Sequence, residues 1–149
     1  AAIVTRLGFG KTDVVQMLNG CIGGLVAITA EPLMPSPLAA ILIGAVGGVI
    51  VVYGTKFLLS LQIDDVVGAI PAHLFAGIWG TLAVPITNSD TSFGAQLLGV
   101  ISINAFVFIV SFIIWALMKN TFGIRLSKEG ELKGTDVTET GVIAYAIRD

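Results

Sequence analysis

The chain has 149 residues, of which 55% are hydrophobic and only 12% charged, with a formal net charge of -2 and a mean hydropathy of +0.94. An ordinary soluble domain carries about a quarter charged residues, so this chain has too few polar groups to coat a globule, and a soluble enzyme of this size is nearly excluded. The charges are also uneven, since 8 fall in residues 1–118 and 10 in residues 119–149. We therefore expect a transmembrane region at 1–118 and an aqueous tail at 119–149.

Four uncharged windows follow one another in the first region. They are residues 14–30 (17 residues), 32–55 (24), 66–89 (24) and 91–118 (28). A helix needs about 20 mainly apolar residues to cross a bilayer, within a range of roughly 17–25, so each window can hold a span and the first is borderline. The alternation typical of a membrane β-barrel is absent, and a helix satisfies its own backbone in lipid. The sequence thus predicts an all-α polytopic membrane protein with four transmembrane helices.

The distribution of Lys and Arg predicts the orientation of these spans. The basic residues that flank the spans all fall on one side, and they are Arg6, Lys11, Lys56, Lys119, Arg125, Lys128 and Lys133. The loops after the first and third windows carry only Glu31 and Asp90 as charges. By the positive-inside rule the basic side is cytoplasmic, which places the tail in the cytoplasm.

The chain opens with apolar residues that run into Arg6 and Lys11, and it has no initiator Met. This order is expected at the cytoplasmic end of a transmembrane helix. We expect the end of an earlier helix here, and hence a C-terminal fragment of a longer membrane protein, with a short leader as the alternative.

Small residues indicate how the spans should pack against one another. The small residues recur at helical spacing as Gly20 and Gly24, as Gly44 and Gly48, and as Gly68, Ala72, Ala76 and Gly80. Such rows let helix backbones approach closely in lipid, so they predict a compact bundle.

Asp64 and Asp65 stand just before the third window, where a carboxylate can accept hydrogen bonds from the first amides of a helix. Helix capping is the expected role of both.

His73 is the only histidine and is the eighth residue of the third window. Ionisable groups are expensive within a membrane and usually face the bundle interior or a water-filled path. A neutral imidazole can accept and donate a proton, which suits it to passing a proton or holding a small polar solute. The row of His73, Gly77 and Thr81 lies beside the small-residue row, so we expect the imidazole to point into a crevice between helices. A purely structural hydrogen bond to a neighbouring helix is the alternative.

Other chemistries find no support in the sequence. One His and one Cys cannot make a Cys/His metal site, and Cys21 is expected to be a packing residue. There is no phosphate-binding glycine loop, and the basic residues are too few for nucleic-acid binding. We therefore expect no metal, no cofactor and no nucleic-acid partner.

Three segments, taken in order, resemble the Amt/Mep/Rh ammonium transporter family. Residues 63–80, IDDVVGAIPAHLFAGIWG, resemble its tenth transmembrane helix, and residues 24–30, GLVAITA, resemble its eighth. Residues 123–127, GIRLS, followed by GTD at 134–136 and AY at 144–145, resemble the start of its regulatory tail. The resemblance covers essentially the whole chain and implies part of an eleven-helix bundle, namely helices eight to eleven and the end of helix seven.

The resemblance implies a homotrimer in the plasma membrane, with a separate pore for ammonium or ammonia in each subunit and no enzymatic activity. His73 would match the second of the paired pore histidines, the first lying on a helix outside this chain. Ala69, one turn earlier, would line the same path. A dry apolar pore rejects a bare cation, because moving charge into a low dielectric is costly, and admits the neutral molecule.

The resemblance also implies a regulatory tail that meets PII-type proteins at the cytoplasmic face. Its matching residues are Arg125, Glu129, Gly134, Asp136 and Tyr145. The chain departs from the family at Gly68, where many bacterial members have Asp, and around Thr140 and Val142, where many have His and Glu. Two alternatives remain: an ammonium sensor with the same fold and a signalling domain beyond residue 149, and a purely structural membrane anchor.

Overall fold

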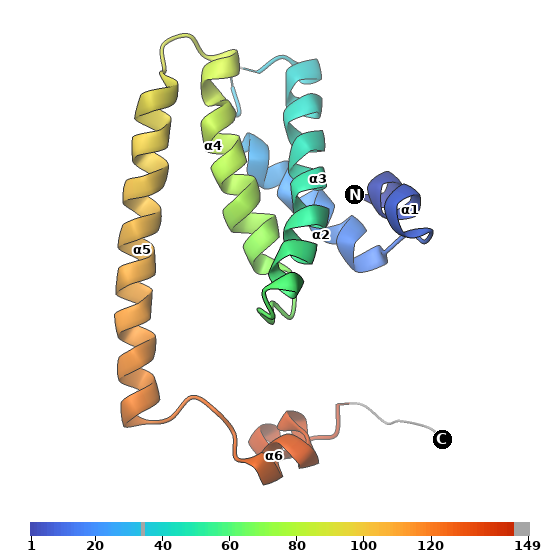
Figure 1. Cartoon of the computed structure of the whole chain (residues 1–149), viewed down its shortest axis with the longest axis vertical. Helices are drawn as coiled ribbons and strands as arrows, with labels where there is room; N and C mark the ends of the chain where they lie inside the picture. Colours follow the sequence, from blue (N-terminus) through green and yellow to red (C-terminus); the bar gives the residue numbers. More distant parts are fainter. Residues whose placement is uncertain (34, 145–149) are drawn as a thin grey trace. The chain divides into compact units, whose positions relative to one another are not determined.

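The computed structural model describes residues 1–33 and 35–144, and every regular element within them is a helix (Figure 1). In chain order the helices are α1 (Ala2–Phe9), α2 (Val14–Ile28), α3 (Pro37–Ser60), the π-helix η1 (Ile70–Phe75), α4 (Ala76–Thr87), α5 (Phe93–Thr121), α6 (Lys128–Lys133) and a second π-helix, η2 (Asp136–Thr140). The expected all-α fold is confirmed.

Three helical segments are long and apolar enough to cross a membrane. They are α3, the continuous pair of η1 and α4, and α5. The remaining apolar helix, α2, has 15 residues, which at about 1.5 Å per residue gives a length of roughly 22 Å. That is shorter than the hydrocarbon core of about 30 Å, so the first window, borderline in the number of uncharged residues, also gives a short helix.

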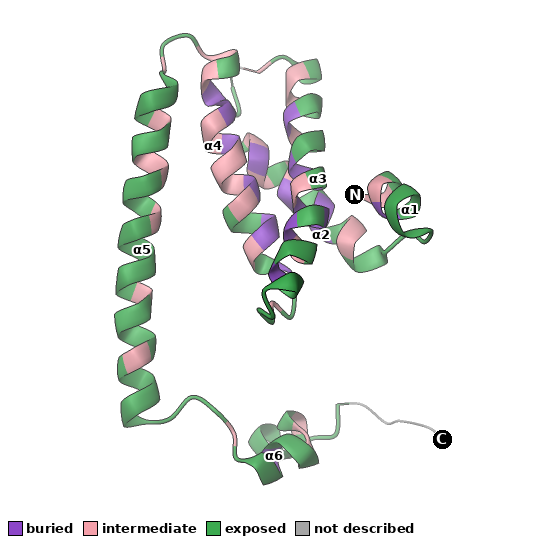
Figure 2. Ribbon diagram, in the orientation of Figure 1, coloured by how far each residue is buried: buried purple, intermediate pink, exposed green. Residues whose placement is uncertain are grey.

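The chain divides into two compact units, Ala1–Ile103 and Asn104–Asp149. The first unit holds α1 to α4 and the start of α5, and the second holds the rest of α5 and the tail. Within α5 no residue is buried, in contrast to α2, α3 and α4 (Figure 2). The domain boundary expected at residue 118 follows the charge pattern and stays a prediction.

The close packing of α2 on α3 is built on glycine. A Cβ on Gly24 would lie 3.2 Å from the Gly44 carbonyl oxygen, and a Cβ on Gly44 would lie 3.3 Å from that of Gly24. A Cβ on Gly47 would come within 2.6 Å of the Gly23 oxygen. Such approach is the geometry that small-residue rows permit in lipid, so the packing predicted from the glycines of α2 and α3 is confirmed. The third row is shorter than predicted, because Gly68 is not helical.

The core beside this contact is completed by α4. Ala27, Ile43 and Ala83, one from each of the three helices, form a buried apolar cluster, and Trp79 packs against it. The Trp79 indole Nε1 donates a hydrogen bond to the Ile43 carbonyl at 3.0 Å. The indole thus joins α4 to α3 by both its apolar surface and its polar edge, which is the usual way a half-buried Trp is accommodated.

The two loops expected on the non-cytoplasmic side are joined to each other. The Asn88 amide Nδ2, at the end of α4, donates a hydrogen bond to Glu31 Oε2 at 3.0 Å, after the end of α2. At the start of α3 the Ser36 hydroxyl accepts from the Ala39 amide, and Pro37 is the first helical residue, a position where its missing N–H leaves no helix bond unmade. Both acidic loops therefore lie at the same end of the first unit.

Candidate functional site

The third span begins later than its uncharged window does. Residues 66–67 form a turn, and Gly68 follows with a φ of +74°. This left-handed conformation is open to Gly and unfavourable for residues with a Cβ, and it ends any helix that might start at residue 66. The regular helix accordingly starts at Ile70.

Asp65 joins this turn to the first residues of the helix. Its carboxylate accepts hydrogen bonds from the backbone N–H groups of Ala69 at 2.9 Å and Ile70 at 2.8 Å. These are the first amides of the helix, which lack partners within it. Asp64 is exposed, and a capping role for it stays a prediction.

His73 lies within η1, three residues after its start. His73 is the eighth residue of the uncharged window but only the fourth residue of this helix, because residues 66–68 are not helical. A π-helix is rare and, where it occurs as a single turn inside a longer helix, is frequently found at functional sites. Here η1 forms the first turn of the third span and continues directly into α4, so the wide turn contains the histidine.

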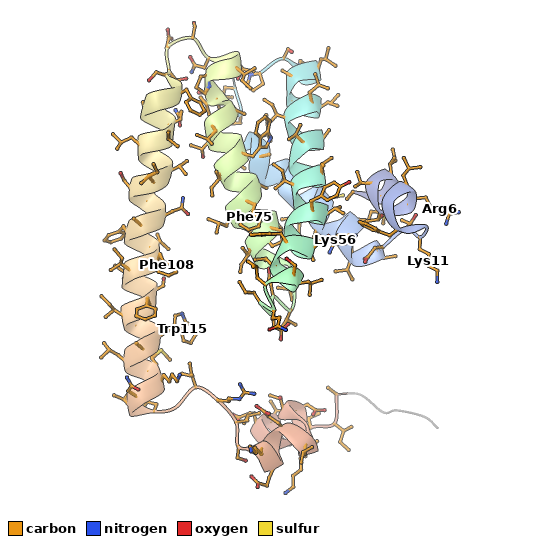
Figure 3. The ribbon with its side chains drawn as sticks, viewed as in Figure 1. Arg6, Lys11, Lys56, Phe75, Phe108 and Trp115 are labelled. Carbon is orange, nitrogen blue, oxygen red and sulfur yellow. The ribbon has the colours of Figure 1, made fainter. Side chains whose placement is uncertain are left out.

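One face of η1 is fixed against α2 and α3. Pro71 and Ala72 are buried, and Phe75 points from η1 toward α3, where its ring centroid lies 6.5 Å from that of Phe57 (Figure 3). Gly54 on α3 makes room for this contact, since a Cβ there would lie 2.7 Å from the Phe75 ring and 3.0 Å from the Pro71 side chain.

His73 and Ala69 occupy the other, outward face. Both are exposed, whereas Gly77 is half-buried. The small residues of the neighbouring row face inward: Ala76 is fully buried, and a Cβ on Gly80 would collide with the Ala27 carbonyl of α2. Within the described part of the chain the imidazole therefore lies at the surface, and the crevice expected around it is not enclosed by these helices alone.

Asn19 was not singled out in the sequence, although it contacts this segment. It is a buried polar residue of α2, and its Nδ2 donates a hydrogen bond to the Val67 carbonyl at 2.8 Å. The one available signal was an amide side chain inside an apolar helix. Pairing it with residue 67 required the tertiary structure, because 48 residues separate the two.

A small cavity lies among α1, α2 and α3, at the end where the basic residues gather. It has a volume of about 150 Å³, and its polar lining consists of Thr5, Asp13, Gln16, Thr55 and Lys56. The Lys56 ammonium sits 3.1 Å from the centroid of the Phe9 ring, a cation–π contact. Lys56, expected only as a topology signal, thus also joins α3 to the end of α1.

The tail residues named by the resemblance take up local structural roles. Arg125 Nε donates to Glu131 Oε1 at 2.8 Å in an exposed ion pair. Glu129 is in the first turn of α6, where a negative charge complements the helix dipole. Gly134 ends α6 with a φ of +100°.

Asp136 closes the loop that follows η2. Its Oδ2 accepts a hydrogen bond from the Ala144 amide at 2.8 Å. This bond, followed by one from the Val137 amide, lowers the pKa of the Asp136 carboxyl from its ordinary value of 3.8, because amide donors stabilise the ionised form. Tyr145, also named by the resemblance, lies outside the described residues.

The sequence and the fold were compared with those of known proteins. The model of the Ammonium Transporter Family matches residues 1–145. The chain belongs to the ammonium transporter family. It is 36% identical to the ammonium transporter Amt2 of Archaeoglobus fulgidus, over 97% of this chain and 35% of that protein. It is also 36% identical to the ammonium transporter Amt1 of Haloferax mediterranei, over 97% of this chain and 29% of that protein.

A solved structure shares the fold of this family member. The structure of a Sensor Amt Protein matches with a TM-score of 0.86 and 29% identity, over 93% of this chain and 37% of that one. The match supports the reading of the helices as part of an Amt bundle. The chain spans about a third of the length of these relatives.

Proposed function

We propose that the full-length protein conducts ammonium or ammonia across the plasma membrane along a path lined by His73 and Ala69. Family membership supports transport as the activity, since the relatives named above are ammonium transporters. The observation that carries the role of His73 is its place in η1: it is an ionisable side chain in the π-helical first turn of the third span, exposed on the face opposite the buried Pro71 and Ala72.

The outward position of His73 fits a path completed by other residues. Ala69 shares the exposed face, and the opposite face is fixed by the buried Pro71 and Ala72. Helices outside this chain would supply the second wall and the partner histidine that the resemblance implies. A neutral imidazole in such a wall can relay a proton while the uncharged molecule crosses the apolar part.

The proposed assembly is a homotrimer with a cytoplasmic C-terminus. The orientation rests on the basic residues at one end of the spans. The ion pair of Arg125 with Glu131 and the loop closed by Asp136 give the tail a defined surface, which a PII-type regulatory protein would meet.

An ammonium sensor is the second candidate, favoured by the match to the Sensor Amt Protein. Uptake of ammonium by cells that lack their own transporters separates the two. Full-length protein is expected to restore uptake, and the His73→Ala variant, present at the same level in the membrane, is expected to lose it. A full-length protein that folds and binds ammonium but never restores uptake would overturn transport in favour of sensing.

A further inference from the structure

The Val67 carbonyl, at the start of the segment that carries His73, has no partner in its own helix. In an uninterrupted helix it would accept from the amide of residue 71, four positions on. Residue 71 is Pro, which has no N–H, and Gly68 turns the backbone out of helical geometry with its φ of +74°. Without a helical partner this carbonyl needs another donor, either a side chain or water.

Asn19 of α2 is that donor. Its Nδ2 lies 2.8 Å from the Val67 oxygen, and Asn19 itself is only 9% exposed. The missing side chain of Gly68 makes the approach possible, because a Cβ on Gly68 would collide with the Asn19 amide nitrogen. Asn19, Val67 and Gly68 therefore form one complementary contact between α2 and the turn.

This contact and the cap on Asp65 fix the entry of η1 from two sides. Asp65 holds the N–H groups of Ala69 and Ile70 from within the same loop. Asn19 holds the carbonyl just before them from a different helix. Among the hydrogen bonds found for residues 64–68 in the described part of the chain, the Asn19 bond is the one that reaches another helix. It adds a directional contact with α2 to the apolar packing of Pro71 and Ala72.

We propose that Asn19 is a positioning residue for His73: its amide anchors the turn before η1 to α2 and so sets the place of the imidazole in the conduction path. The proposal rests on the proposed function of His73. Small displacements of a positioned group have large effects on rate and selectivity, whereas a bond that serves stability alone affects all solutes alike.

The test uses full-length protein in liposomes and measures the ratio of ammonium flux to potassium flux per folded protein. Asn19→Leu keeps a similar volume and removes the donor, and Asn19→Ala is a second variant in case the first does not assemble. Thr55→Val is the matched control, because it removes a hydroxyl of α3 that shares its hydrogen between Gln16 Oε1 of α2, at 3.3 Å, and the Val51 carbonyl of its own helix, at 2.9 Å. His73→Ala and the double variant Asn19→Leu/His73→Ala complete the set.

Asn19→Leu or Asn19→Ala is expected to lower the flux ratio by about 10-fold or more, while Thr55→Val leaves it within about 2-fold although it also lowers thermal stability. In the His73→Ala background Asn19→Leu should change the ratio no further, because residues that act through one another are not additive. An unchanged ratio in both Asn19 variants, an equal fall in Thr55→Val, or an additive fall in the double variant would overturn the proposal. If His73→Ala itself leaves the ratio unchanged, the proposed function of His73 fails first and the role of Asn19 with it.

Discussion

Gly68 shows how one residue shapes the candidate site. Its φ of +74° and the Asn19 amide beside it leave no room for a side chain. The family resemblance leads one to expect Asp at this position, where this chain has Gly. In this chain the space next to the backbone is taken by Asn19, and Asp65 supplies the carboxylate that caps the helix.

We predict that Gly68→Ala lowers the free energy of unfolding of the full-length protein. The left-handed backbone conformation and the collision with Asn19 together should cost about 1–3 kcal/mol. Gly8→Ala is the control, because Gly8 is helical, has no positive φ and has open space around its Cβ position. Thermal unfolding in detergent measures both, and a Gly68→Ala protein as stable as Gly8→Ala would contradict the geometry of the turn.

We predict that the loop closed by Asp136 opens at acid pH. The folded pKa of Asp136 lies below its ordinary value of 3.8, so the carboxylate stabilises the loop fully above about 3.8 and loses this effect as the pH falls through the lower folded value. Hydrogen exchange at the Ala144 amide of the full-length protein, corrected for the intrinsic rate, should show protection that falls below pH 3.8. Asp136→Asn should reduce that protection already at neutral pH, and protection that is independent of both changes would refute the role of this bond.

At the scale of elements, helix packing was predictable and helix boundaries were not. The small residues predict where α2 and α3 make contact, because their helical spacing places Gly24 on a small-residue face of α2 and Gly44 on a small-residue face of α3. The start of η1 could not be predicted from charge, since the uncharged window continues through a turn set by Gly68. The π-turn at His73 leaves no period of its own in a uniformly apolar segment.

We predict that Gly47→Leu separates α2 from α3. A Cβ at Gly47 already lies 2.6 Å from the Gly23 oxygen and 2.9 Å from the Ala27 side chain, so a larger group must push the helices apart, at about 1–3 kcal/mol for overpacking. Ala45→Leu, on the exposed face of the same helix, is the matched control and should leave the melting temperature nearly unchanged. Equal melting temperatures for the two variants would show that this contact does not limit stability.

For the whole molecule, composition and charge predicted the class of protein, and the resemblance of three segments predicted the family. The low charge content, four windows and one-sided Lys and Arg led to a polytopic bundle. Neither the composition nor the resemblance could show the surroundings of His73, because the face that it occupies is open in this chain. The chain spans about a third of the length of its relatives. Residues that meet only in three dimensions, such as Asn19 and Val67, were likewise outside the reach of spacing.

We predict that the loop after α3 faces the cytoplasm and the loop after α4 the outside. Single cysteines at Ser60, the last residue of α3, and at Ser89, introduced into a cysteine-free full-length protein that includes Cys21→Ser, report on the two sides. A membrane-impermeant thiol reagent added to intact cells should modify Ser89→Cys at once and Ser60→Cys only after permeabilisation. The reverse pattern would overturn the orientation and the cytoplasmic tail.

His73 is proposed to line the conduction path, and this role can be measured. Ammonium flux into liposomes that contain the full-length protein, measured side by side for wild type and His73→Ala at equal amounts of folded protein, tests it most directly. We expect His73→Ala to lose selective ammonium flux by about 10-fold or more while its melting temperature stays close to that of the wild type. Unchanged flux and unchanged preference for ammonium over potassium in that variant would contradict it.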